Sequence, residues 1–144
     1  MSTPFEQYRP FKILQNSVPV PITVPEDSNV WTEVITIQET GLPNGTYIIN
    51  GSVFFTPTSN SKSTLFRSVV KGVAGQPVSY EAKDATDRLL EPFRTFVVVD
   101  DGVMDFKIEC QVENGQGSQG VTVDLTLADY ERKLETTDPL GLNP

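Results

Sequence analysis

Hydrophobic and polar residues alternate along most of the chain between residues 31 and 130, which is the period of a β-strand with one buried face. The clearest example is VMDFKIECQVE (103–113), in which the apolar residues from Met104 to Val112 fall on every second position. Shorter runs of the same kind are WTEVITI (31–37), TYIINGSVFFT (46–56), TLFRSVVK (64–71), FRTFVVV (93–99) and VTVDLTLADY (121–130). These six runs predict an all-β fold, an antiparallel β-sandwich or jelly roll.

The alternation also predicts which side chains face the core. In the 46–56 run, Gly51 interrupts the pattern and indicates a bulge or a close approach of two backbones. The 93–99 run is apolar on nearly both faces, so we expect it to be a central strand. The inward side chains are predicted to be Tyr47, Ile49, Val53 and Phe55 in one strand, Met104, Phe106, Ile108, Cys110 and Val112 in a second, and Val121, Val123, Leu125 and Leu127 in a third.

Turn signals separate these runs. GLPNG (41–45) closes the first strand, DDG (100–102) indicates a tight hairpin, and NGQGSQG (114–120) indicates a hairpin loop. Residues 72–92 are less regular, and we expect a short strand at 78–80 and a helical turn near 85–90 there.

The segment KILQNSVPVPITVPEDSNVW (12–31) combines prolines with β-branched residues and therefore predicts an extended arm. The arm can cover its own sheet or reach a neighbour. Twenty extended residues span about 65–75 Å, whereas the rest of the domain is about 35 Å across, which favours a neighbour. We expect an arm at 1–30, a β-sandwich domain at 31–130 and a C-terminal tail at 131–144. The arm residues expected to bind a partner are Val18, Pro19, Val20, Pro21, Ile22 and Val24.

A second apolar surface is expected on the outside of the sandwich, because several strands carry large apolar residues on both faces. Exposed apolar patches on small domains mark contacts with other chains. Phe54 and Phe66 are the expected partner-binding residues, with Ile48, Phe96 and Val98 nearby, and we expect a homo-oligomer, a dimer or trimer. Trp31, at the start of a strand just after the arm, is expected to fix the direction in which the arm leaves the domain and to join the partner-binding set.

Composition removes several functions. The net charge of −8 and the scattered Lys and Arg residues argue against nucleic acid as a partner. The chain has no histidine, so Ser-His and Cys-His catalysis is excluded, and its single cysteine, Cys110, is expected in the core. We expect no cofactor, no metal site, no membrane partner and no enzyme activity. A glycan-cleaving enzyme that uses two of Asp105, Glu109 and Asp124 is the catalytic alternative.

The N-terminus has no signal-peptide pattern and no run reaches transmembrane length, so we expect synthesis in a cytoplasm. The Pro-rich arm followed by GTYIINGSVFF and VMDFKIECQVENGQGSQGVTVDLTLADYERK resembles the small jelly-roll virion proteins of tailed bacteriophages, namely capsid decoration or cement proteins and head-fibre or tail-adaptor domains. GTYIINGSVFF is also similar to a strand of trimeric jelly rolls of the tumour-necrosis-factor type. The resemblance covers residues 12–130 and implies a virion location and binding to capsid or other virion proteins. The alternative is a receptor- or carbohydrate-binding module or adaptor of a phage tail or fibre.

Overall fold

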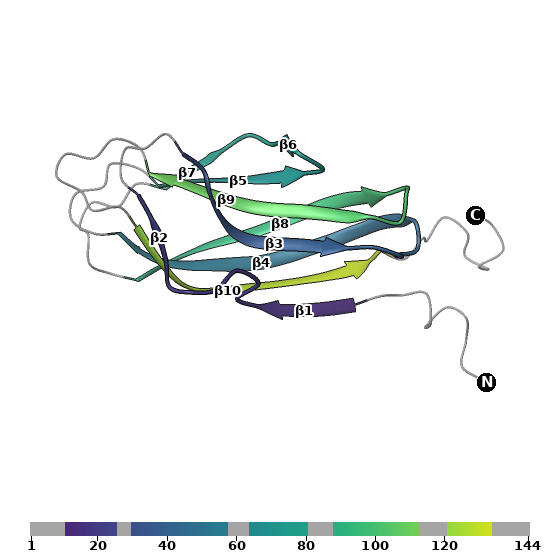
Figure 1. Cartoon of the computed structure of the whole chain (residues 1–144), viewed down its shortest axis with the longest axis horizontal. Helices are drawn as coiled ribbons and strands as arrows, with labels where there is room; N and C mark the ends of the chain where they lie inside the picture. Colours follow the sequence, from purple (N-terminus) through teal and green to yellow (C-terminus); the bar gives the residue numbers. More distant parts are fainter. Residues whose placement is uncertain (1–10, 26–29, 58–63, 81–87, 113–120, 134–144) are drawn as a thin grey trace.

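The structure is a computed structural model and describes residues 11–25, 30–57, 64–80, 88–112 and 121–133. Within these residues the chain forms β-strands and no helix, and the strands run along the long axis of the molecule (Figure 1). The strands are β1 (Phe11–Gln15), β2 (Ile22–Val24), β3 (Thr32–Glu39), β4 (Gly45–Pro57), β5 (Thr64–Val70), β6 (Val73–Ala74), β7 (Val78–Tyr80), β8 (Leu89–Val99), β9 (Met104–Val112) and β10 (Val121–Arg132).

Two antiparallel sheets pack face to face. Sheet A has the order β1-β10-β4-β8, with β2 also paired to β10, and sheet B has the order β3-β9-β5-β6, with β7 paired to β5. From β3 to β4, β4 to β5, β8 to β9 and β9 to β10 the chain crosses from one sheet to the other. This wrapping is the jelly-roll arrangement, so the predicted fold class is confirmed.

The core lies between the sheets and is made by the inward half of each alternating strand. Tyr47, Phe55 and Phe106 are its largest fully buried side chains. The predicted inward faces of β4 and β9 are confirmed, and Cys110 is buried as expected. A Cβ atom at Gly51 would lie 2.5 Å from a ring carbon of Phe93 and would also collide with the backbone carbonyl of Leu127, which confirms the predicted close approach.

The predicted inward face of β10 is only half right. The pairing of β10 with β4 shifts between Val123 and Leu125, and the bulge reverses which face the following residues occupy. Val121 and Val123 are buried as predicted, but Leu127 is exposed and Thr126 is buried in its place. A strict period of two cannot anticipate the extra residue, which is Asp124.

Strand β8 lies at the edge of sheet A, so the prediction that it is central is wrong. Its outer residues are apolar yet exposed, with Phe96 56% and Val98 63% exposed. Pro92 fits an edge strand, because proline removes one ladder donor. The expected helical turn near 85–90 lies partly outside the described residues, and Leu89 and Leu90 begin β8 instead.

The DDG segment (100–102) does not form a tight hairpin. It joins β8 in sheet A to β9 in sheet B, and these strands do not pair. The positive φ of Gly102 serves a turn between the sheets, which bonds to the neighbouring 41–45 turn. Leu42 N donates to Gly102 O at 3.0 Å, and Gly102 N donates to Asn44 Oδ1 at 3.2 Å. The 114–120 segment lies outside the described residues, but it too joins strands of different sheets, so it does not connect a hairpin.

Candidate interaction surface

Large apolar side chains lie on the outer face of sheet A in each of the strands β1, β10, β4 and β8, with polar residues between them. Strand registers place outward residues in rows, because directly paired residues of an antiparallel sheet share a face. One row runs Phe11, Glu131, Ile48, Phe96 and another runs Leu125, Phe54, Leu90. We define the apolar face as Phe11, Ile13, Ile48, Phe54, Leu90, Phe96, Val98, Leu125 and Leu127.

Large side chains of this face are open to solvent. Ile13 is 67% exposed, Val98 63%, and Phe11 and Phe96 both 56%. Cations lie over two of its rings: the Arg88 guanidinium is 4.7 Å from the ring centre of Phe54, and that of Arg94 is 5.6 Å from Phe96. Such stacking lowers the cost of exposing an aromatic ring without removing the apolar surface.

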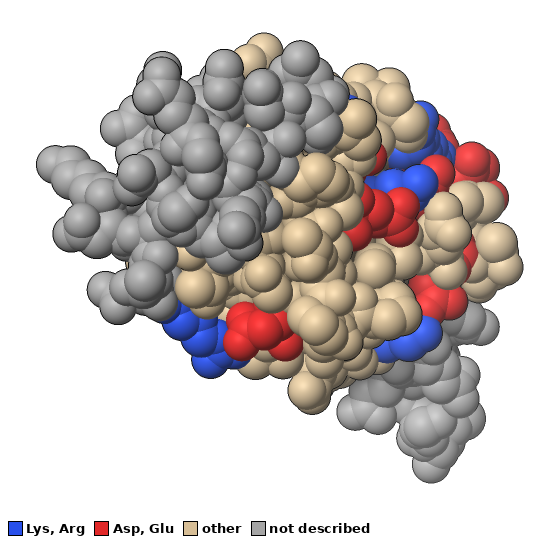
Figure 2. Space-filling view, turned by 60° about the vertical axis from the view of Figure 1, so that its left-hand side comes forward, with Lys and Arg blue, Asp and Glu red and all other residues tan. Residues whose placement is uncertain are grey.

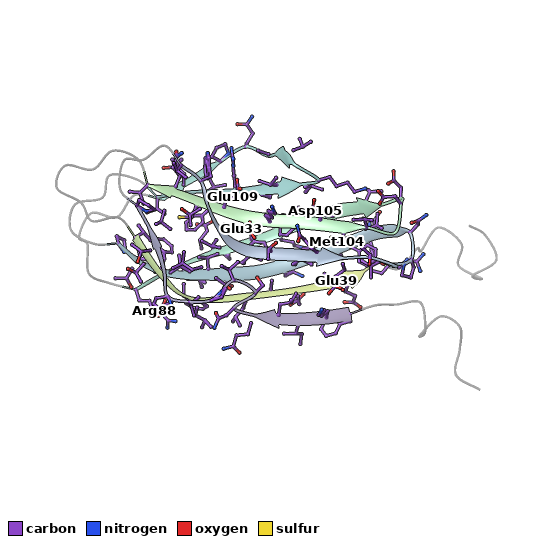
Figure 3. All side chains as sticks on the ribbon, in the orientation of Figure 1. Glu33, Glu39, Arg88, Met104, Asp105 and Glu109 are labelled. Atoms are coloured by element: carbon purple, nitrogen blue, oxygen red, sulfur yellow. The ribbon has the colours of Figure 1, made fainter. Side chains whose placement is uncertain are left out.

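The outer face of sheet B is different, because its charges pair within the chain. Glu33 lies 3.6 Å from Lys107, and Arg67 lies 2.8 Å from Glu109. Figure 3 labels Glu33, Glu109 and Asp105 along this sheet, and Figure 2 shows positive and negative side chains next to one another on the side turned to the viewer. The strands β3, β5 and β9 of sheet B therefore have ion pairs between them, whereas the outer face of sheet A combines large exposed apolar side chains with the charged residues Arg94 and Asp129.

The arm lies on its own sandwich in this structure. β1 pairs with one part of β10 and β2 with another, and Ile22 and Val24 are buried in the core. Val18 and Val20 are half-buried against the core, whereas Pro19 and Pro21 are exposed. The peptide bond between Val20 and Pro21 is cis.

Polar contacts fix the arm over the side of the sandwich between β10 and β3. Asn16 Oδ1 accepts from Thr126 N at 2.9 Å, and Asn16 N donates to Thr126 O at the same distance. Ser17 Oγ accepts from Thr36 N at 3.0 Å, and Lys12 pairs with Glu39. The arm thus joins sheet A to the edge of sheet B, and of its predicted partner-binding residues only Pro19 and Pro21 remain exposed.

Trp31 and Phe66 take different positions. The Trp31 ring is half-buried and stacks under the Arg67 guanidinium at 4.1 Å, and Arg67 also pairs with Glu109. Phe66 is 4% exposed and packs on Phe55 with ring centres 5.2 Å apart. The expectation of an outward Phe66 therefore fails on geometry, whereas Phe54 faces outward as expected.

The opposite side of the sandwich, between β8 and β5, is not covered by the arm. A cleft of about 280 Å³ opens there, lined in part by Phe66, Gln76, Phe93 and Glu91. Burial raises the pKa of the Glu91 carboxyl. Besides this carboxylate, the cleft is lined by Arg67 and Arg94 and by apolar, hydroxyl and amide side chains.

The three carboxylates of the catalytic alternative are spread over both sheets. Asp124 is on β10 in sheet A, where it pairs with Arg88 at 3.0 Å, whereas Asp105 and Glu109 are on β9 in sheet B. Four residues of strand separate Asp105 from Glu109 by about 13 Å, more than the roughly 5–10 Å of glycosidase carboxyl pairs. The geometry does not assemble the pair that this alternative requires.

Other reactive groups also lack a site within the described residues. Burial raises the pKa of the Cys110 thiol far above its ordinary value, so this thiol stays protonated. No cluster of three metal-ligating side chains occurs in the described ranges.

The same ranges contain no helix of the length and apolar character needed to cross a bilayer. A receptor- or carbohydrate-binding module would need exposed aromatic side chains in the loops 57–63 and 114–120, which lie outside the described residues except for Pro57.

The sequence did not identify two charged residues of the surface, Arg94 and Asp129. Arg94 and Asp129 are outward residues of the same row of sheet A, on the two strands that flank β4. Neither makes an ion pair with any described residue. The signal for the edge position of β8 was Pro92, whereas nothing in the sequence alone places residue 129 beside residue 50.

No family model and no curated protein matches the chain. Solved structures do match: VP2 in a subviral particle of infectious bursal disease virus is 12% identical with a TM-score of 0.56, over 85% of this chain and 32% of that one. The structure of the Gt strain of the same virus is 11% identical with a TM-score of 0.54, over 83% of this chain and 33% of that one. Dimeric latent PorU from Porphyromonas gingivalis is 10% identical with a TM-score of 0.50, over 88% and 13%. The chain spans about a third of the virus proteins it matches, and these likenesses show the fold.

Proposed function

We propose that the chain is a non-enzymatic structural protein of a virus particle, which binds neighbouring protein subunits through the apolar face of sheet A. The observation that carries the proposal is the contrast between the two outer faces. Charges of β3, β5 and β9 in sheet B pair with one another, whereas sheet A exposes Phe96, Val98 and Ile13 on its outer face. Apolar surface of this extent on a small domain is stabilised when another protein covers it.

The shared fold supports a place in a virion. Matching structures come from infectious bursal disease virus, and one of them is a subviral particle of VP2. The finer role is a decoration or cement protein on the capsid of a tailed bacteriophage. A protein that binds only the assembled shell stabilises it by mass action, and several linked copies increase the effect through avidity.

The arm has a smaller part in this proposal than its length suggests. Its buried residues are used inside the domain, so contact with a capsid subunit falls to the exposed Pro19 and Pro21 and to Phe11 and Ile13 of β1. Phe11 and Ile13 lie on β1 at the edge of sheet A and belong to the apolar face itself.

Within the described residues, three groups that catalysis could use are engaged in other contacts. Glu109 and Asp124 are each engaged by an arginine and lie in different sheets. The Cys110 thiol lies in the core and is held protonated. The chemistry of the described surface is that of contact between proteins.

The proposal is tested by footprinting on particles. Gradient-purified particles of the virus that encodes the chain are analysed by mass spectrometry, and hydroxyl-radical labelling of Val98 is compared between particles and the dilute free chain. Val73 is the matched control, since it is 72% exposed on β6 of the other sheet. We expect the chain in the particles, with labelling of Val98 reduced several-fold and that of Val73 retained. Absence from the particles, or equal labelling of Val98 in both states, would refute the proposal.

A further inference from the structure

The rows of sheet A define a pattern that is close to symmetric about β4. β10 lies on one side of this strand and β8 on the other, each about 4.8 Å away. In the central row Asn50 lies on β4, between Asp129 on β10 and Arg94 on β8. The two opposite charges are therefore equally distant from the β4 axis.

A second copy placed on this face can be related by a two-fold axis that runs along β4 between the two sheets. Such an axis brings β8 of each copy over β10 of the other. Arg94 then lies opposite Asp129 in the second copy, twice over. The same operation puts Leu90 over Leu125, and Phe54 over its own counterpart on the axis.

The alternative two-fold axis, across the strands, is disfavoured by the same charges. It would place Arg94 opposite Arg94 and Asp129 opposite Asp129. Like charges brought together in a contact cost free energy, whereas complementary charges fix the orientation of the two partners. Of these two axes through the central row, the charges favour the one along β4.

The overlapping surface has the size of a weak, concentration-dependent interface. An axis along β4 superposes the three strands β10, β4 and β8 of the two copies, which from Thr46 to Phe54 measure about 14 Å by 30 Å, at 4.8 Å between strands and 3.4 Å per residue. Two such faces give about 850 Å² of flat contact, which is in the range of weak and transient interfaces. Sheets stacked face to face are about 10 Å apart, a gap that an arginine side chain can span toward a carboxylate.

From these observations we propose that the apolar face of sheet A pairs with the same face of a second copy of this chain. The two-fold axis runs along β4, and two reciprocal Arg94–Asp129 ion pairs flank a central contact of Phe54 with its counterpart. This inference rests on the proposed function, because it names the protein that covers the apolar face. It also explains why Arg94 and Asp129 have no ion-pair partner among the described residues of their own chain.

The experiment is a charge exchange between two chains. Arg94→Asp and Asp129→Arg are made separately, each folded as judged by near-ultraviolet circular dichroism. Arg94 and Asp129 of one chain lie on strands that are separated by β4, with Asn50 between them. Dimer formation that is restored when the two variants are mixed therefore reports a contact between chains. Lys107→Glu on sheet B is the control with the same change of net charge as Arg94→Asp.

Light scattering and native mass spectrometry give the result. We expect the wild type and Lys107→Glu to approach twice the 15.9 kDa of one chain with rising concentration. Each single variant on sheet A should raise the dissociation constant at least about tenfold. A one-to-one mixture of the two variants should form the mixed dimer, since both of its charge pairs are again opposite.

Two results overturn the inference: a wild type that keeps the mass of one chain throughout, or a mixture that associates no better than either variant alone. The footprint on particles separates this from the proposed function. A monomeric chain whose Val98 is still protected in particles rejects only the pairing of copies. Unprotected Val98 rejects the proposed function itself.

Discussion

Replacing the two buried residues of β2 tests whether the arm belongs to the core of its own domain. Ile22 is 9% exposed and Val24 is fully buried, and β2 pairs with the start of β10. Ile22→Ala and Val24→Ala each remove two or three carbon atoms and leave a cavity, at a cost of about 2–3 kcal/mol each. Together they should lower the free energy of unfolding by about 4–6 kcal/mol, a large part of the 5–15 kcal/mol of a typical domain.

The assay is urea unfolding at equilibrium, followed by the fluorescence of Trp31, the single tryptophan, and by far-ultraviolet circular dichroism. With a slope of about 2 kcal/mol per molar urea, the double variant should unfold about 2–3 M earlier. Thr23→Ala is the matched control, because Thr23 is the exposed residue between the two and should change stability by less than about 0.5 kcal/mol.

The reasoning is refuted if the double variant loses less than about 1 kcal/mol, since the arm would then contribute little to the core in solution. Deletion of residues 1–25 follows the same logic. It removes Ile22 and Val24 together with the half-buried Leu14, Val18 and Val20, and we expect the truncated chain not to fold. A folded truncated chain would support the sequence-based interpretation, in which the arm is free to reach a neighbouring subunit.

Three further substitutions test other parts of the fold. Gly51→Ala should destabilise the protein by about 1–3 kcal/mol in the same urea assay, because the added Cβ would collide with the backbone of β10. The control Ser52→Ala should hardly change the free energy of unfolding. Asn16→Ala should cost about 1–3 kcal/mol by leaving the part-buried Thr126 N–H without its acceptor, and Asn16→Asp, which keeps an acceptor, should recover most of the loss. The raised pKa of Glu91 means that its charge is disfavoured in the folded state, so stability falls as pH rises from the ordinary carboxyl pKa through the raised one. Glu91→Gln should therefore raise the melting temperature at pH 7 but not at pH 3, and an equal gain at both would contradict the burial argument.

The strands could be predicted because a residue's face in a strand depends only on its immediate neighbours in sequence. Alternation located β4 and β9 and assigned Tyr47 and Phe106 to the core. It failed in β10 because the extra residue at Asp124 moves every following residue of the strand to the opposite face of the sheet. It failed for β8 because apolar residues on both faces are typical of a central strand and equally of an edge strand whose outer face meets another protein.

The sheet order was beyond the sequence for a different reason. Each sheet is assembled from strands far apart in the chain, so turns that resemble hairpin turns join two sheets instead. The arm was misjudged because its extended length was compared with the width of the domain. Its actual path uses two separate pairings along β10 and a bend between them. Of the predicted binding residues, Phe54 was placed correctly on the outer face because its neighbours Val53 and Phe55 are both predicted, and found, to face the core.

The position of the last two strands has a consequence for how the protein is made. β10 lies between β1 and β4, and β9 lies between β3 and β5, so each sheet has one of the two latest-synthesised strands in its interior. Until both have left the ribosome, the earlier strands can form only isolated pairs such as β4 with β8. At about 5–20 residues per second, β1 waits roughly 5–20 s for its partner. The apolar residues of half a sandwich are exposed for that time, so a growing chain of this design depends on dilution or on a chaperone until its final strand arrives.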